Sequence, residues 1–117
     1  MAETRLMDIY KHLSNSGIET YFPAQKCGEC LNTYAVVKDA GTMKYPGLSS
    51  TQSLVDILCY APKNKFTTLD QFVSMVENHM KALQPMIMPT YFRTPSFYDD
   101  SIKGYMISIQ YRYSKKI

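Results

Sequence analysis

The chain has 117 residues, of which 45% are apolar and 20% charged, and a formal net charge of +3. These values are typical of one soluble globular domain spanning residues 1–117. The net charge is too small for nucleic-acid binding to be inferred from charge alone. No run of 18 apolar residues occurs, and charges interrupt the apolar residues of the first segment, so we expect neither a membrane span nor a secretory signal but a soluble, cytosolic protein.

A helix is predicted from about Thr4 to Asn15, since its apolar residues recur at the offsets of one helical face. Gly17, just beyond it, is a plausible left-handed stop. The apolar face consists of Leu6, Ile9, Tyr10 and Leu13.

Two strands are predicted next, a short one at Ile18–Phe22 and a β-branched and aromatic one at Thr33–Lys38. Asp39-Ala40-Gly41 has the chemistry of a turn that closes the second strand. The segment Thr42–Ser53 is rich in Gly, Pro, Ser and Thr, which indicates an extended hairpin arm or a mobile loop. Short connections favour antiparallel pairing of these early strands.

Leu54–Tyr60 is almost continuously apolar and is predicted to be a central strand ended by Pro62. A second helix follows, with Thr67 or Thr68 as its cap and Asp70 in its first turn. Its buried stripe is predicted to be Leu69, Phe72, Val73, Val76, Met80 and Leu83.

The last part of the chain is predicted to form strands. Met86–Phe92 is apolar but broken by Pro89, which favours a partly paired edge strand or an irregular connector. From residue 105 onward, apolar and polar residues alternate with a period of two, as in a half-buried strand. One face has Tyr105, Ile107, Ile109, Tyr111 and Tyr113, and the other has Met106, Ser108, Gln110, Arg112 and Ser114.

The order of these elements predicts an α+β fold: a mixed, mainly antiparallel sheet of four to five strands with two helices packed on one face. The other face would hold the polar residues of the last strand. We judge that face too polar for a second core and suited to a subunit contact or a lumen.

No acid, base and nucleophile set is visible, so the chain is not expected to be an enzyme or to have catalytic, cofactor or metal residues. Cys27 and Cys30 are spaced as half of a tetrahedral zinc site, but completing it would need Cys59 with His12 or His79. Thiol exchange would need a helix N-terminus after the first cysteine, where a strand follows instead. A tight turn with reduced thiols is the favoured interpretation.

The chain has ten tyrosines, which is an excess. Tyrosine combines a large contact area with a polar tip, and protein interfaces are enriched in it. Tyr105, Tyr111 and Tyr113 are more simply residues at the edge of the core.

Several segments carry a family resemblance: CLNTYAVVKDAGT at 30–42, LCYAP at 58–62 leading into a helix, and MPT, TPSFYDD and SIQYR between Met88 and Arg112. The chain resembles the small tail-terminator, or tail-completion, proteins of long-tailed bacteriophages and prophages, often called minor capsid proteins. The similarity covers almost the whole chain, although Cys27 lies outside the pattern.

This resemblance implies a structural virion protein that assembles as a ring, expected to be a hexamer, at the head-proximal end of the tail tube. Such a ring stops tube polymerisation and presents the surface that joins the head connector. Its partners would be further copies of itself, the tail tube protein and the head–tail connector, with DNA passing through the lumen without specific binding. It would lie in the virion tail, and in the bacterial cytoplasm during assembly, without contact with a membrane.

A cyclic ring needs two different, complementary patches on each subunit. We expect them on the 42–53 arm, on the loop around residues 93–98 and on the polar sheet face. The predicted contact residues are Lys44, Tyr45, Arg93, Phe97, Tyr98, Gln110 and Arg112.

Three alternatives remain open at this stage. One is a head-closure or connector-adaptor protein, which works beside a terminator in the same structure. The second is a small zinc- or thiol-dependent module built on Cys27 and Cys30, and the third is a regulatory binding domain that uses the tyrosine-rich surface.

Overall fold

A computed structural model describes residues 5–23, 30, 32–44, 50–84 and 86–116. Over these residues it shows the expected α+β class, with a six-stranded mixed sheet where four to five strands were predicted. In chain order the elements are α1 (Arg5–Asn15), β1 (Thr20–Tyr21), β2 (Tyr34–Lys44), β3 (Ser50–Pro62), η1 (Lys63–Lys65), α2 (Thr67–Met80), η2 (Lys81–Leu83), β4 (Ile87–Arg93), β5 (Phe97–Asp99) and β6 (Gly104–Lys116).

The strand order across the sheet is β1-β2-β3-β6-β4, and β5 continues the β4 edge by pairing with the start of β6. β3 is therefore central, as predicted, and β4 is an edge strand, also as predicted. All pairings are antiparallel except that of β1 with β2, so the expectation of antiparallel pairing was wrong there. The connection from Tyr21 to Tyr34 is long enough for the chain to return and enter β2 in the same direction as β1.

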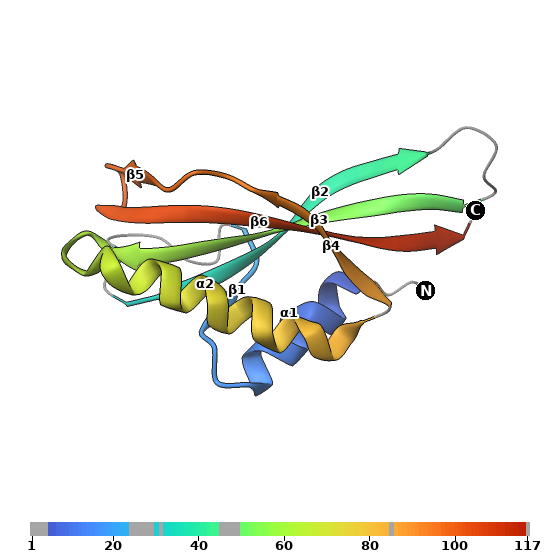
Figure 1. Cartoon of the computed structure of the whole chain (residues 1–117), viewed down its shortest axis with the longest axis horizontal. Coiled ribbons are helices and arrows are strands. Elements are labelled where there is room, and N and C mark those ends of the chain that lie inside the picture. The colour runs from blue at the N-terminus through green and yellow to red at the C-terminus, as the bar shows by residue number, and fades with distance from the viewer. Residues whose placement is uncertain (1–4, 24–29, 31, 45–49, 85, 117) are drawn as a thin grey trace.

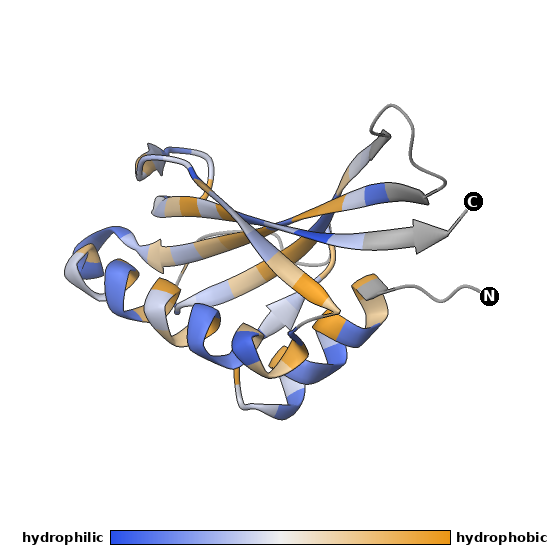
Figure 2. Cartoon of the chain, turned by 45° about the vertical axis from the view of Figure 1, so that its right-hand side comes forward, coloured by the Kyte–Doolittle hydropathy of each residue, from blue (hydrophilic) through white to orange (hydrophobic). Residues whose placement is uncertain are grey.

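Both helices cover one face of the sheet (Figure 1). α1 contacts β1, β2 and α2, and α2 contacts β3 and β6. The apolar stripes predicted for the two helices face this core, and the solvent side of α2 is hydrophilic (Figure 2). Gly17 ends α1 with a φ of +89°, as its position suggested. The largest fully buried core side chains include Ile9, Leu13, Val37, Val55, Ile57, Cys59, Leu69, Val73, Val76, Met80 and Ile87.

The segment Asp39-Ala40-Gly41 does not close β2 as predicted but forms a bulge within it. The pairing of Asp39 with Val55 is followed by that of Gly41 with Leu54, which leaves Ala40 as an extra residue. Gly41 has a φ of +98°, and its N–H donates to Asp39 Oδ1 over 2.9 Å. These residues do have the chemistry of a turn, but here they bend β2, and the strand continues beyond them.

Beyond the bulge, β2 and β3 pair as far as Lys44 and Thr51, so the two strands form an extended arm. For the described residues of the 42–53 segment, this agrees with the first of its two interpretations, an extended hairpin arm. Tyr45 lies outside the described residues, and of Lys44 only the backbone is described.

The predicted threonine cap of α2 is wrong. Phe66 occupies the N-cap position without a side-chain hydrogen bond, and the Thr68 hydroxyl donates to the carbonyl of Lys65 over 2.6 Å. The 3-10 turn η1 leads directly into α2, so a backbone turn replaces a side-chain cap.

Candidate interaction surface

The outer edge of the sheet consists of β4 and β5, which pair one after the other with β6. Arg93 ends β4, and Phe97 and Tyr98 begin β5. The loop predicted around these three residues is thus largely strand, and all three side chains are exposed on one edge. The structure therefore brings together three of the residues expected at contacts.

Within β4 a wide bulge interrupts the ladder. Pro89 pairs with Tyr111 and Arg93 pairs with Ile109, so β4 advances by four residues over a stretch where β6 advances by two. Tyr91 lies at the bulge with a φ of +65°, a left-handed conformation that costs a non-glycine residue about 1–2 kcal/mol.

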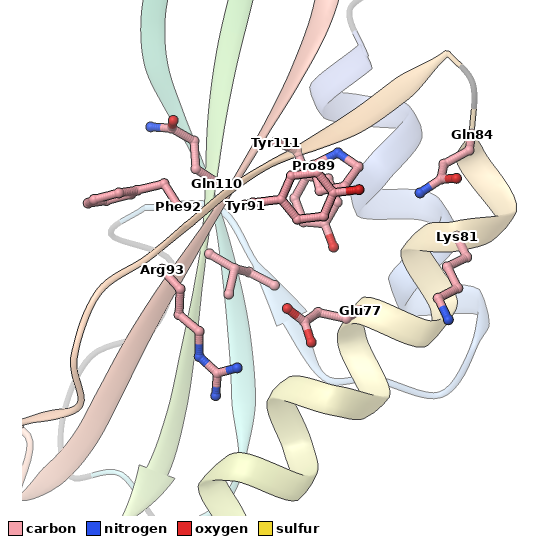
Figure 3. A pocket seen from close by; sticks show the side chains of 10 residues that line it. Glu77, Lys81, Gln84, Pro89, Tyr91, Phe92, Arg93, Gln110 and Tyr111 are labelled. Carbon is pink, nitrogen blue, oxygen red and sulfur yellow. The ribbon is translucent and has the colours of Figure 1, made fainter.

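The bulge is held by one hydroxyl and exposes two aromatic rings, which point to opposite sides of β4 (Figure 3). Thr90 Oγ1 accepts the N–H of Phe92 over 3.2 Å and lies 3.1 Å from Gln110 Oε1, to which it donates. The side chain of Tyr91 is 86% exposed and that of Phe92 57%. Neither residue was singled out from the sequence, where the only signal was that Pro89 breaks an apolar run.

An ion pair ties this edge to the start of α2. Arg93 Nη2 lies 3.2 Å from Asp70 Oδ1, and the two side chains are 41% and 82% exposed. A pair so exposed contributes at most about 1 kcal/mol to stability. Its effect is mainly to orient the guanidinium, which keeps exposed N–H groups for another acceptor.

Beneath the bulge, between β4, β6 and α2, lies a cavity of about 310 Å³. In Figure 3 the ring of Tyr91 lies close to Pro89 and Tyr111, and the Glu77 carboxylate points toward the sheet. Burial raises the pKa of Tyr111, so its phenol stays protonated at neutral pH. The lining residues are Glu77, Lys81, Gln84, Pro89, Tyr91, Phe92, Arg93, Ile109, Gln110 and Tyr111.

At the other end of the same edge, aromatic rings cluster around Tyr105. Its ring meets that of Phe66 at 4.6 Å and that of Tyr98 at 5.3 Å between centroids, both in edge-on geometry. Phe66, Phe97 and Tyr98 remain 40–48% exposed. We call the exposed set Phe66, Tyr91, Phe92, Phe97 and Tyr98 the aromatic edge. Such a concentration of exposed apolar side chains is typical of an interaction site.

The face of the sheet opposite the helices, here called the open face, carries the predicted polar residues of β6. Gln110 Nε2 donates to Asp56 Oδ1 over 3.4 Å, and Arg112 Nη1 donates to Gln52 Oε1 over 3.4 Å. Lys38 pairs in register with Asp56, which extends a polar row across β2, β3 and β6. Gln110 and Arg112 therefore lie where the alternation of β6 placed them.

The open face is not polar throughout, which corrects the expectation that it could hold no second core. Tyr34 and Val36 of β2 are buried there with Cys30, and Tyr34 stacks on Tyr60 with ring centroids 4.7 Å apart. The expectation rested on β6 alone, whereas this cluster belongs to β2 and β3. We call it the open-face cluster; its partly buried members are Tyr21, Leu58, Tyr60 and Ile102.

The described part of the chain does not bring Cys30 together with the residues that would complete a zinc site. Cys30 is buried in the open-face cluster, whereas Cys59 is fully buried in the core beneath the helices, on the other side of the sheet. His12 and His79 are also on the helix side, where His12 Nε2 lies 2.7 Å from the His79 carbonyl oxygen. Cys27 is outside the described residues, and among the residues that are described no three potential ligands gather around a point.

Comparison with known proteins adds no family: no protein-family model matches the chain, and no curated protein matches it significantly. Within the described part of the chain, neither helix has the length and apolar character needed to cross a membrane.

Replacing Tyr91 with glycine should stabilise the fold. Glycine adopts a positive φ without steric cost, which outweighs its larger unfolded-state entropy, and the lost ring is almost fully exposed. We expect Tyr91→Gly to raise the free energy of unfolding by about 0.5–1 kcal/mol in urea titrations. The matched control Phe92→Gly, at an ordinary φ, should lower it by about 0.5–1 kcal/mol. Equal losses in both variants would contradict the proposed strain.

The buried thiol and phenols predict a loss of stability at alkaline pH. Burial raises the pKa values of Cys59, Tyr34, Tyr60 and Tyr111 in the folded state. Their contribution is therefore complete below the unfolded-state values, about 8.5 for the thiol and 10 for the phenols, and is lost as pH rises above them.

The free energy of unfolding from urea titrations should accordingly be constant to about pH 8.5 and then fall. The fall is up to about 1.4 kcal/mol per pH unit for each group that titrates only in the unfolded chain. Tyr111→Phe removes one such group, so its stability should fall less steeply above pH 10. A wild-type profile that stays flat to pH 10.5 would refute this assignment.

Proposed function

We propose that the protein is a structural virion assembly protein of the tail-terminator type, which caps a phage tail tube and forms the head–tail joining ring. The observation that carries the proposal is the aromatic edge, a set of five exposed aromatic side chains. Two of them lie on the strained bulge of the edge strand β4. A monomer gains nothing from such exposure, whereas a subunit of an assembly buries it. The sequence resemblance supplies the kind of assembly.

Ring formation requires two unlike patches on one subunit. The aromatic edge provides one, at the β4–β5 side of the sheet. The open face provides the other, because it combines a polar row with an apolar cluster and neither helix of the described residues covers it (Figure 1). The β2–β3 arm projects from the same sheet and would contact the tube or the next subunit.

The polar row suits a surface near passing DNA. Lys38, Arg112 and Asp56 place both charge signs on the open face, and the net charge of the chain is only +3. Tight phosphate binding needs several unopposed cations, which would slow DNA passage through a lumen. The mixed charges are compatible with transit without specific binding.

The first test is whether the genes beside this one encode a tail tube protein, and the second is assembly with that protein. We expect substoichiometric amounts of this protein to shorten polymerising tubes in negative-stain images, because capped ends cannot grow. Light scattering after size exclusion should show a ring that forms with rising concentration or on the tube tip. Unchanged tube lengths, together with a protein that stays monomeric at every concentration, would contradict the proposal.

A head-closure or connector-adaptor role is the nearest alternative and predicts a different partner. Such a protein would bind the purified portal ring and leave tube growth unaffected, so a binding comparison with the two partners separates the roles. Metal analysis of protein purified without chelator tests whether the chain is a zinc module. The separation of Cys30 from Cys59 by the sheet weighs against that module.

A further inference from the structure

We propose that the cavity between α2, β4 and β6 binds an organic cation, with the carboxylate of Glu77 receiving its charged group. The ligand class is a single ammonium or guanidinium group on an apolar chain, carried by a free small molecule or by a basic side chain. The inference does not depend on ring assembly, because every residue that it uses belongs to one subunit.

The carboxylate of Glu77 lies beside the core without a counter-charge. Glu77 follows the fully buried Val73 by four residues, so it lies one turn further along the same side of α2. Its side chain is half-buried and points toward the sheet (Figure 3). Among the described residues, no hydrogen bond or ion pair reaches this carboxylate.

This position is unfavourable for a negative charge in the free protein. Glu77 is in the last turn of α2, where the helix dipole disfavours an anion. Partial burial also removes hydration from the carboxylate, and no partner within the described part of the chain compensates for that loss. A cationic ligand would compensate for both effects.

The phenol of Tyr111 faces the same space as Glu77. The charge of Glu77 adds to burial in raising the pKa of Tyr111, so the two groups lie within electrostatic range. Among the described residues the phenol hydroxyl has no hydrogen-bond partner, and none of their polar side-chain atoms is both fully buried and unpartnered. The hydroxyl is therefore accessible from the cavity, where its oxygen can accept an N–H of the ligand.

The other walls of the cavity suit an apolar chain. Pro89 and Ile109 line it, and the ring of Tyr91 lies on the same side of β4 as Tyr111, whereas Phe92 points to the other side (Figure 3). Tyr91 is 86% exposed, so a ligand would cover a ring that the chain itself leaves open. Aromatic faces attract cations, and about 310 Å³ is within the range of small-molecule sites.

Two cations also line the cavity, but neither neutralises Glu77. Arg93 Nη2 pairs with Asp70 Oδ1 over 3.2 Å. The ammonium of Lys81 and the carboxylate of Glu77 point in different directions in Figure 3, and no ion pair joins them. A second positive charge on the ligand would meet Lys81 or Arg93, so the ligand should carry only one.

Other classes of ligand fit this cavity less well. An anion would be repelled by Glu77, and a neutral apolar molecule would bury the carboxylate without compensating it. A metal ion needs several protein ligands, and in the described part of the chain no three potential ligands gather around a point. A monocation on an apolar chain satisfies both the carboxylate and the apolar walls.

Titration of the isotope-labelled full chain with small probes, followed by NMR chemical shifts, tests the ligand class. The probes are pentylammonium and pentylguanidinium as cations, 1-pentanol as the neutral analogue, pentanoate as the anion and 1,5-diaminopentane as the dication. We expect the two monocations to shift the amide signals of Glu77, Ile109 and Tyr111. Their dissociation constants should be at least about tenfold lower than that of 1-pentanol, with pentanoate and the dication also weaker.

Two variants test the assigned residues. Glu77→Gln keeps the size of the side chain and should remove the tenfold preference for the cation over 1-pentanol. Tyr111→Phe keeps the ring and should weaken pentylammonium binding about fivefold. The control Asp100→Asn removes a carboxylate from an exposed turn and should bind like the wild type.

Urea unfolding of the free proteins separates a binding role of Glu77 from a structural one. We expect Glu77→Gln to be at least as stable as the wild type, because the carboxylate has no partner to lose. A clear loss of stability in this variant would show that Glu77 supports the fold, and would overturn the inference. Binding of pentylammonium no tighter than that of 1-pentanol to the wild type would also overturn it, whatever the variants do.

A blocked lysine, N-acetyl-lysine methylamide, distinguishes the two sources of the cation. If it binds as tightly as pentylammonium, the cavity admits a basic side chain of a partner protein. If pentylammonium binds and the blocked lysine does not, the cavity admits only a free small molecule. Either result supports the cation site and leaves the proposed assembly to its own test.

Discussion

The antiparallel pairing of β3 with β6 is the constraint on which both faces of the sheet depend. It runs from Ser50 opposite Lys116 to Pro62 opposite Gly104 without a register shift. Because side chains alternate along a strand, this register places Ile57 and Ile109 under the helices and Asp56 and Gln110 on the open face. A slip of one residue would exchange the two sets, so the helical core fixes the open face as well.

Two of the proposed contacts, the β2–β3 arm and the aromatic edge, are departures from the regular ladder beside that central pair. β2 bends at Gly41 and continues as an arm, and β4 opens at Tyr91 and exposes its rings. Bulges protect an edge from uncontrolled strand addition. In β4 the same irregularity creates a shaped aromatic surface, and the ion pair of Arg93 with Asp70 ties it to α2. Protection against aggregation and the proposed docking would therefore arise from one local structure.

Much of the fold could be predicted because its signals are periodic and local. The alternation along β6 and the stripe of α2 predicted which residues face the core, and Gly17 marked the end of α1. The placement of Gln110 and Arg112 on the open face followed from the same alternation. These successes depend only on neighbours in the sequence.

The failures depend on partners distant in the sequence. The open-face cluster joins Tyr34 to Tyr60 through the register of β2 and β3, which no local pattern specifies. Asp39-Gly41 has identical chemistry in a turn and in a bulge, and only the pairing strand distinguishes them. The exposure of Tyr91 and Phe92 results from a mismatch in length between β4 and β6, whereas an apolar run alone suggests burial.

The most direct test of the central claim is hydroxyl-radical footprinting of the wild-type protein, read by mass spectrometry in the monomeric and assembled states. We expect assembly to protect Tyr91, Phe92 and Phe97 together with Tyr60 on the open face. Met7 and Met75, which are exposed on the helices, should be oxidised equally in both states. Protection of the two methionines with unchanged oxidation of Tyr91 and Phe92 would show that the subunits associate through the helical layer and would contradict the account.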